Sequence, residues 1–79
     1  MVKGKVNIQD QYLNQIRKEK IKIQIDVENG GIFEGVINSF DLFCVILTVD
    51  GFGPVLIYKS AIKSIRPSSL EDSKKIELF

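Results

Sequence analysis

Several residue types are absent or scarce in this 79-residue sequence, and each absence excludes a class of site. The chain has no histidine and no tryptophan, and its single cysteine is Cys44. One cysteine cannot form an internal disulfide, and a chain without histidine or a cysteine cluster is poorly equipped to bind a metal. We therefore expect no metal and no other cofactor. A lone cysteine also fits a reducing compartment, so we expect a cytoplasmic protein.

Long apolar runs are missing as well. The first residues are polar, and no apolar run approaches the roughly 18 residues of a membrane-spanning helix. The sequence thus predicts neither a signal peptide nor a membrane partner.

Patterns typical of enzymes are also scarce. The glycines at Gly51 and Gly53 belong to a turn that is too short for a nucleotide-binding loop. The carboxylates Asp10, Asp41 and Asp50 are explained by a helix start and two turns. We therefore expect no catalytic activity.

The length allows one domain, and a chain this short rarely gains more than about 3–5 kcal/mol from its core. Without a disulfide or a metal, association with other chains is the remaining means of stabilisation. The net charge is only +1, so overall charge does not indicate a nucleic-acid partner, and the argument depends on where the charges lie.

A helix is predicted at residues 8–18. Asn7 is a suitable N-cap, Asp10 suits the first turn, and Tyr12, Leu13 and Ile16 share one face. Its end is basic, and four of the eleven Lys and Arg residues fall within six positions: Arg17, Lys18, Lys20 and Lys22. These cations either complement the helix dipole or form a patch for phosphates, and the pattern fits both interpretations.

Strands are predicted at residues 21–28, 31–41, 43–50, 54–59 and 61–66. The first alternates strictly between apolar and polar residues, and Asn29-Gly30 after it is a strong hairpin signal. Gly35 lies inside the second, where glycine permits a sharp bend or the close approach of another backbone. The third is apolar on both faces, which predicts cover on both sides and a buried Cys44.

The predicted fold is therefore mainly β, with an N-terminal α-helix followed by a strongly bent five-stranded antiparallel sheet. This domain spans residues 1–67. Residues 68–79 are polar, which predicts a frayed tail, although Ile76, Leu78 and Phe79 are unusual there.

The fourth and fifth strands would form the two edges of the sheet. Both are short and apolar, and an unprotected apolar edge must pair or aggregate. If the fourth strand of one copy pairs with the fifth of the next, the contact is head-to-tail and repetition closes a ring. The edges thus predict a cyclic homo-oligomer.

Five segments also carry a resemblance to a known family, in order and with small differences in spacing. They are NIQDQYLN (7–14), RKEK (17–20), VENG (27–30), GVINSFD (35–41) and VLIYKSAI (55–62). Together they resemble Hfq, the bacterial Sm-like RNA chaperone family. The resemblance implies an Sm-like small barrel, a homohexameric ring and binding of uridine-rich RNA. It also implies that small regulatory RNAs are helped to pair with messenger RNAs, in post-transcriptional regulation and the stress response.

The resemblance implies three RNA-binding surfaces, the first of which is a proximal site at the pore. Its residues would be Gln9, Asp41, Leu42, Phe43, Tyr58, Lys59 and Ser60. Phe43 would stack a uridine base and Lys59 would supply a cation and donor. The family usually has glutamine at Leu42 and histidine at Ser60, so we expect a working site that is weakened or retuned. In an alternative interpretation, Phe43 belongs only to the core.

The second surface is a basic rim, and the third is the distal face. The rim residues would be Asn14, Arg17, Lys18, Lys20 and Phe40. The distal residues would be Asp26, Gly30, Gly31, Ile32, Phe33 and Glu34. The family often has an aromatic residue at Asp26 and glutamine at Glu34, and carboxylates repel phosphates. We therefore expect no family-like binding of adenine-rich RNA there.

Two function classes remain open. One is a ring-shaped RNA chaperone. The other is an Sm-like ring that serves as a protein-interaction scaffold with RNA binding reduced or lost. The substitutions on the distal face and at the pore keep the second class open.

Overall fold

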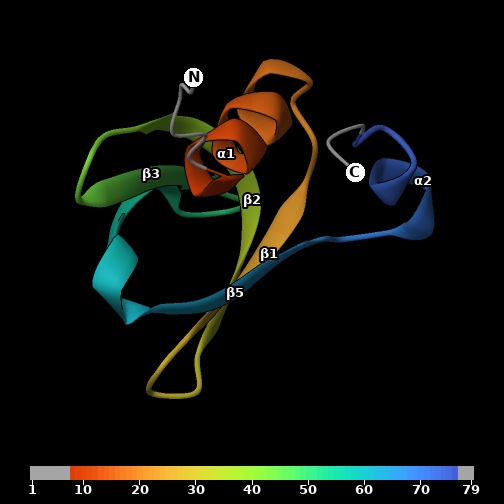
Figure 1. Ribbon diagram of the computed structural model, residues 1–79. Helices are drawn as coiled ribbons and strands as arrows, with labels where there is room; N and C mark the ends of the chain where they lie inside the picture. Colours follow the sequence, from red (N-terminus) through yellow and green to blue (C-terminus); the bar gives the residue numbers. More distant parts are fainter. Residues whose placement is uncertain (1–7, 77–79) are drawn as a thin grey trace, which may run out of the picture.

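The computed structural model describes residues 8–76, and it contains a bent sheet with a helix packed across it (Figure 1). The elements in chain order are α1 (Ile8–Lys18), β1 (Ile23–Val27), β2 (Ile32–Phe40), β3 (Cys44–Val49), β4 (Gly53–Tyr58), the 3₁₀-helix η1 (Lys59–Ala61), β5 (Ile62–Pro67) and α2 (Leu70–Ser73). Each strand begins and ends within two residues of its expected position.

All five strands belong to one antiparallel sheet with the order β4-β3-β2-β1-β5. The sheet curls strongly. In Figure 1, β5 runs along the lower side of the curled sheet, where it pairs with β1. This confirms the predicted fold class of an N-terminal helix and a bent five-stranded sheet. It also confirms that β4 and β5 are the edge strands.

Gly35 marks the place where β2 and β3 come unusually close. A Cβ atom on Gly35 would lie 2.0 Å from the backbone oxygen of Thr48. No side chain fits at that distance, so glycine is required by the approach of the neighbouring backbone. A register shift follows between Ile37 and Ser39, which adds to the local twist of the strand.

The core lies between α1 and the concave face of the sheet. Its buried apolar side chains are Leu13, Ile16, Ile21, Ile23, Ile25, Val27, Ile37, Val45, Leu47 and Ile57. Alternate residues of β1 are buried, as the strict apolar and polar alternation predicts. Each such side chain contributes roughly 1.5–3 kcal/mol on burial, so this cluster holds α1 against the sheet.

The prediction that the third strand is buried on both faces is wrong. In β3, Val45 and Leu47 are buried, whereas Cys44 and Ile46 are half-buried and Thr48 is exposed. The reason is that α1 covers only the concave side of the curved sheet. Cys44 is therefore only half-buried, not fully buried as its residue type suggested. It is the first residue of β3 and directly follows an exposed turn.

The predicted frayed tail is also wrong for the residues that the structure describes. Ser69 caps α2 by accepting a hydrogen bond from the Asp72 backbone N–H at 3.2 Å, and Ile76 packs against the core cluster. The terminal residues Leu78 and Phe79 lie outside the described residues, as does the expected N-cap Asn7.

Residues 8–76 lack two other kinds of feature. No helix there has the length and apolar character needed to cross a membrane. No group of three or more histidine, cysteine or acidic side chains in that range is arranged to hold a metal ion.

Candidate nucleic-acid interface

A hollow beside the β2–β3 turn brings together most of the residues expected at the pore. Its volume is about 520 Å³, and its lining residues are Gln9, Leu42, Phe43, Tyr58, Lys59 and Ser60. We call it the pore-site hollow. It joins the start of α1, the β2–β3 turn and the β4–η1 junction, which are distant in the sequence. Of the expected residues only Asp41 does not line it.

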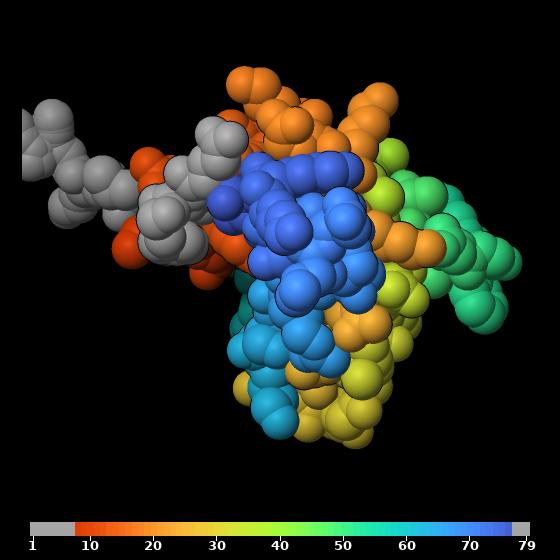
Figure 2. Space-filling view, turned by 90° about the vertical axis from the view of Figure 1, so that its right-hand side faces the viewer, coloured from red at the N-terminus to blue at the C-terminus, as the bar shows by residue number. Residues whose placement is uncertain are grey.

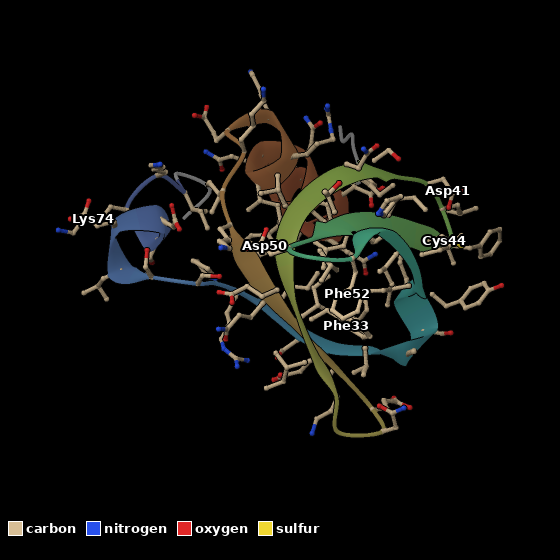
Figure 3. The ribbon with its side chains drawn as sticks, turned by 180° about the vertical axis from the view of Figure 1, so that it is seen from behind. Phe33, Asp41, Cys44, Asp50, Phe52 and Lys74 are labelled. Carbon is tan, nitrogen blue, oxygen red and sulfur yellow. The ribbon has the colours of Figure 1, made fainter. Side chains whose placement is uncertain are left out.

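Asp41 instead shapes the turn from which Phe43 projects. Its Oδ1 atom accepts hydrogen bonds from the backbone N–H groups of Phe43 and Cys44, each at 2.8 Å. These two N–H donors hold the pKa of the Asp41 carboxyl below its usual value. The turn stands at the end of the sheet in Figure 3, where Asp41 and Cys44 are labelled.

Phe43 is 69 % exposed, which excludes the alternative in which it belongs only to the core. Leu42 and Tyr58 are exposed beside it, at 72 % and 62 %. An exposed aromatic ring with apolar neighbours is the surface on which a nucleotide base stacks.

Lys59 is more constrained than expected. Its Nζ atom lies 3.2 Å from Asp10 Oδ1 and 5.3 Å from the centre of the Phe40 ring, and its side chain is only 13 % exposed. Its backbone N–H also donates to the Phe43 carbonyl at 2.8 Å. Lys59 therefore lines the pore-site hollow while its ammonium group is held by Asp10 and the Phe40 ring. The sequence indicated Asp10 only as a helix-start residue, because nothing local shows that a residue 49 positions later returns to it.

A second hollow of about 300 Å³ lies at the predicted rim. It is lined by Asn14, Arg17, Asn38, Ser39 and Phe40. Arg17 donates from Nη2 to Asn14 Oδ1 at 2.6 Å, which joins two of the lining side chains. Lys18 and Lys20 are exposed at the end of α1 without lining it. Sequence reasoning missed Asn38 and Ser39, although both belong to the motif that carried the resemblance.

A third hollow of about 390 Å³ takes in half of the expected distal residues. Its lining residues are Ile32, Phe33, Glu34, Val49, Asp50, Phe52 and Val55. Figure 3 labels Phe33, Phe52 and Asp50 on this side of the sheet. Gly30 and Gly31 lie in the β1–β2 hairpin outside it, and Asp26 lies on β1. The sequence treated Phe52 only as a turn residue, yet its side chain is 84 % exposed.

Two carboxylates, Asp26 among the expected distal residues and Asp50 in the third hollow, each form an ion pair. Asp26 Oδ2 lies 2.7 Å from Arg66 Nη1 and accepts a hydrogen bond from Ser64 Oγ at 3.0 Å. The hydrogen bond from Arg66 lowers the pKa of Asp26 most, and the hydrogen bond from Ser64 lowers it further. Asp50 pairs with Lys22 at 2.6 Å, which raises the pKa of Lys22. Arg66 therefore offsets part of the phosphate repulsion expected from Asp26.

Comparisons with known proteins agree on one family. The sequence model described as Hfq protein matches residues 8–74. The RNA-binding protein Hfq of Caldicellulosiruptor bescii is 48 % identical over 68 residues, which cover 86 % of this chain and 74 % of that protein. The RNA-binding protein Hfq of Brucella ovis is 46 % identical over 68 residues, with 86 % of each chain covered. A crystal structure of the pleiotropic translational regulator Hfq superimposes with a TM-score of 0.72 at 33 % identity, covering 76 % of this chain and 98 % of that one.

Proposed function

The chain belongs to the Hfq family, and from this premise we propose that it is a cytoplasmic RNA chaperone without enzymatic activity. In this proposal its copies form a homohexameric ring that holds uridine-rich RNA near the pore. The ring then promotes the pairing of small regulatory RNAs with messenger RNAs.

The observation that carries the proposal is the exposed ring of Phe43 at the pore-site hollow. Asp41 fixes the turn beneath it, and Lys59 and Gln9 line the same hollow as polar groups. A base stacked on an aromatic side chain gains roughly 1–3 kcal/mol. A ring repeats that gain in every subunit, so one strand of several uridines binds far more tightly than one nucleotide.

Assembly into a ring is supported by the two edge strands. Both β4 and β5 have one edge that is not paired within the described chain, and β4 also exposes Leu56 and Tyr58. An apolar edge of this kind requires a partner strand. Pairing β4 of one copy with β5 of the next supplies it and brings neighbouring pore-site hollows around one axis.

The rim supports the chaperone role. Phosphates attracted to Arg17, Lys18 and Lys20 would be bound with little dependence on base sequence and strong dependence on salt. We expect the Arg17→Ala, Lys18→Ala double variant to lower the rate of RNA annealing more than it lowers uridine affinity. An equal loss of both would contradict separate roles for the rim and the pore.

The distal face is proposed not to bind adenine-rich RNA in the family's manner. Asp26 offers no aromatic ring, and its carboxylate is engaged by Arg66 and Ser64. Glu34 offers only acceptor oxygens where the family often has an amide. Affinity for oligo(A) comparable to that for oligo(U), and abolished by Asp26→Lys, would contradict this part of the proposal.

The decisive experiment is a titration of labelled oligo(U) and oligo(A) at two salt concentrations, on protein whose mass in solution has been measured. The proposal expects ring-sized particles that bind oligo(U) more tightly than oligo(A). Rings that bind neither would overturn it and favour a protein-interaction scaffold. A lone folded subunit indifferent to uridine would overturn both.

A further inference from the structure

The segment that follows β5, residues 68–76, folds back onto the body of the subunit. Its first backbone N–H, at Ser68, donates to the Lys22 carbonyl at 2.9 Å and continues the pairing of β5 with β1. At its other end Gln15 Nε2 donates to the Lys75 carbonyl at 3.3 Å, and Ile76 packs against the core. We call residues 68–76 the C-terminal segment, and Figure 2 shows it lying against α1.

This docking places two lysines next to the basic end of α1. Lys74 and Lys75 are both exposed, and Lys74 lies at the outer side of α2 in Figure 3. Gln15, which holds the Lys75 backbone, lies three positions before Lys18 and shares a face of α1 with it, whereas Arg17 lies on the opposite side of the helix, at the second hollow. The lysines of the C-terminal segment therefore continue the basic surface that begins at Lys18, at the end of α1.

The acidic residues nearby offset only part of this charge. Asp72 is turned inward, with its side chain 21 % exposed and its Oδ1 atom 3.6 Å from Lys75 Nζ. It is also held by the Ser69 hydroxyl at 3.2 Å, so its role is to fix the turn. The exposed carboxylates nearby are Glu19 and Glu71, against the exposed cations Lys18, Lys20, Lys74 and Lys75.

We propose that the C-terminal segment extends the basic rim into a larger phosphate-binding surface for single-stranded RNA, with Lys74 and Lys75 as its additional contacts. The inference rests on the proposed RNA-binding function and concerns strands long enough to leave the pore. Lysines held in place by a docked segment lose less conformational freedom on binding than lysines of a loose tail. Each phosphate contact to a single strand adds about 0.7 to the slope of log affinity against log salt.

The test is the Lys74→Ala, Lys75→Ala double variant, titrated with a single-stranded RNA of roughly 30 nucleotides and with a six-uridine strand over a range of salt concentrations. We expect the salt slope for the long RNA to fall by up to about 1.4 for each subunit that it contacts, with the six-uridine affinity unchanged. An unchanged slope for the long RNA would overturn the proposal. Lys63→Ala, which removes an exposed lysine from β5, is the control for a general loss of charge.

A second variant tests whether docking matters. Ile76→Ser removes the apolar anchor and leaves every charge in place. We expect it to weaken binding of the long RNA while the ring mass stays the same. If Ile76→Ser binds the long RNA as the unaltered protein does, the lysines act from a loose tail and the docked surface is refuted. Failure of the unaltered protein to bind six uridines would instead overturn the proposed function itself, so the two results are distinguishable.

Discussion

At the scale of single residues, one carboxylate decides where an aromatic ring points. Asp41 accepts two backbone hydrogen bonds, and the tight turn that results turns Phe43 out to solvent. The sequence indicated both residues, because an aspartate at the end of a strand is a recognisable turn signal. It did not indicate that Lys59 contacts Asp10 and Phe40, since these partners meet only when the sheet curls.

Replacement of Phe43 by alanine should weaken oligo(U) binding by roughly 1–3 kcal/mol for each base that stacks. The cause is loss of the stacking surface, and fluorescence anisotropy of a labelled six-uridine strand measures it. Phe52→Ala is the matched control, because Phe52 is equally a solvent-exposed phenylalanine but lines the third hollow. If both variants lose the same oligo(U) affinity, Phe43 is not a specific stacking site for uridine.

Acid should destabilise the protein partly through Asp41. The pKa of its carboxyl is lowered in the folded chain from an ordinary value of 3.8, so its contribution is present above that value and is lost as pH falls through the folded pKa. Urea unfolding at pH values from 6 to below 3 measures the effect. Asp41→Asn, which cannot ionise, should lose less stability over that window than the unaltered chain. If both proteins lose the same stability as the pH falls, ionised Asp41 does not stabilise the fold.

At the scale of elements, strict periodicity made the helix and the strands predictable, whereas the C-terminal segment was mispredicted from its polar composition. Alternation along β1 indicated its buried face, which the structure confirms. The run from Ser69 to Asp72 has the spacing of a helix N-cap followed three residues later by an acid, and that signal could have indicated α2. The contact of Ile76 with the core depends on tertiary packing and has no local signal.

Gly35→Ala should destabilise the sheet strongly, because the added Cβ would meet the Thr48 backbone oxygen at 2.0 Å. We expect a loss at or above the upper end of the roughly 1–3 kcal/mol typical of overpacking. For a chain of this size each kcal/mol lowers the melting temperature by about 4–8 °C, which calorimetry resolves.

Gly31→Ala is the control for Gly35→Ala. Its added Cβ would lie 3.3 Å from the flexible Val27 Cγ2 atom, so a small shift accommodates it. If both variants have the same melting temperature, the close approach of β2 and β3 is not the reason that position 35 requires glycine.

At the scale of the whole molecule, the sheet curls without joining its two edges to each other, since β4 and β5 are the outermost strands of the order. The sequence predicted these edges from strand count and composition. Leu42 and Ser60, where the family usually has glutamine and histidine, both line the pore-site hollow. Residue type alone does not predict how a base would fit there.

Leu56→Glu should prevent assembly and leave the subunit folded. Leu56 is 51 % exposed on the edge strand β4, so a charge there costs the single subunit little but would be buried against a neighbouring copy. Analytical ultracentrifugation should show lone subunits for this variant. Phe52→Glu, on the turn between β3 and β4, should assemble normally, and a ring of unaltered mass for Leu56→Glu would contradict assembly through β4.

The single thiol of the sequence has a practical consequence. Cys44 is half-buried at the start of β3, directly after Phe43, so each copy offers one attachment point for a dye beside the place where a base would stack. A closed hexamer labelled there would carry six fluorophores at equal intervals around a common centre. Stepwise photobleaching of such particles would count their members, and self-quenching would report when an oligonucleotide threads among them.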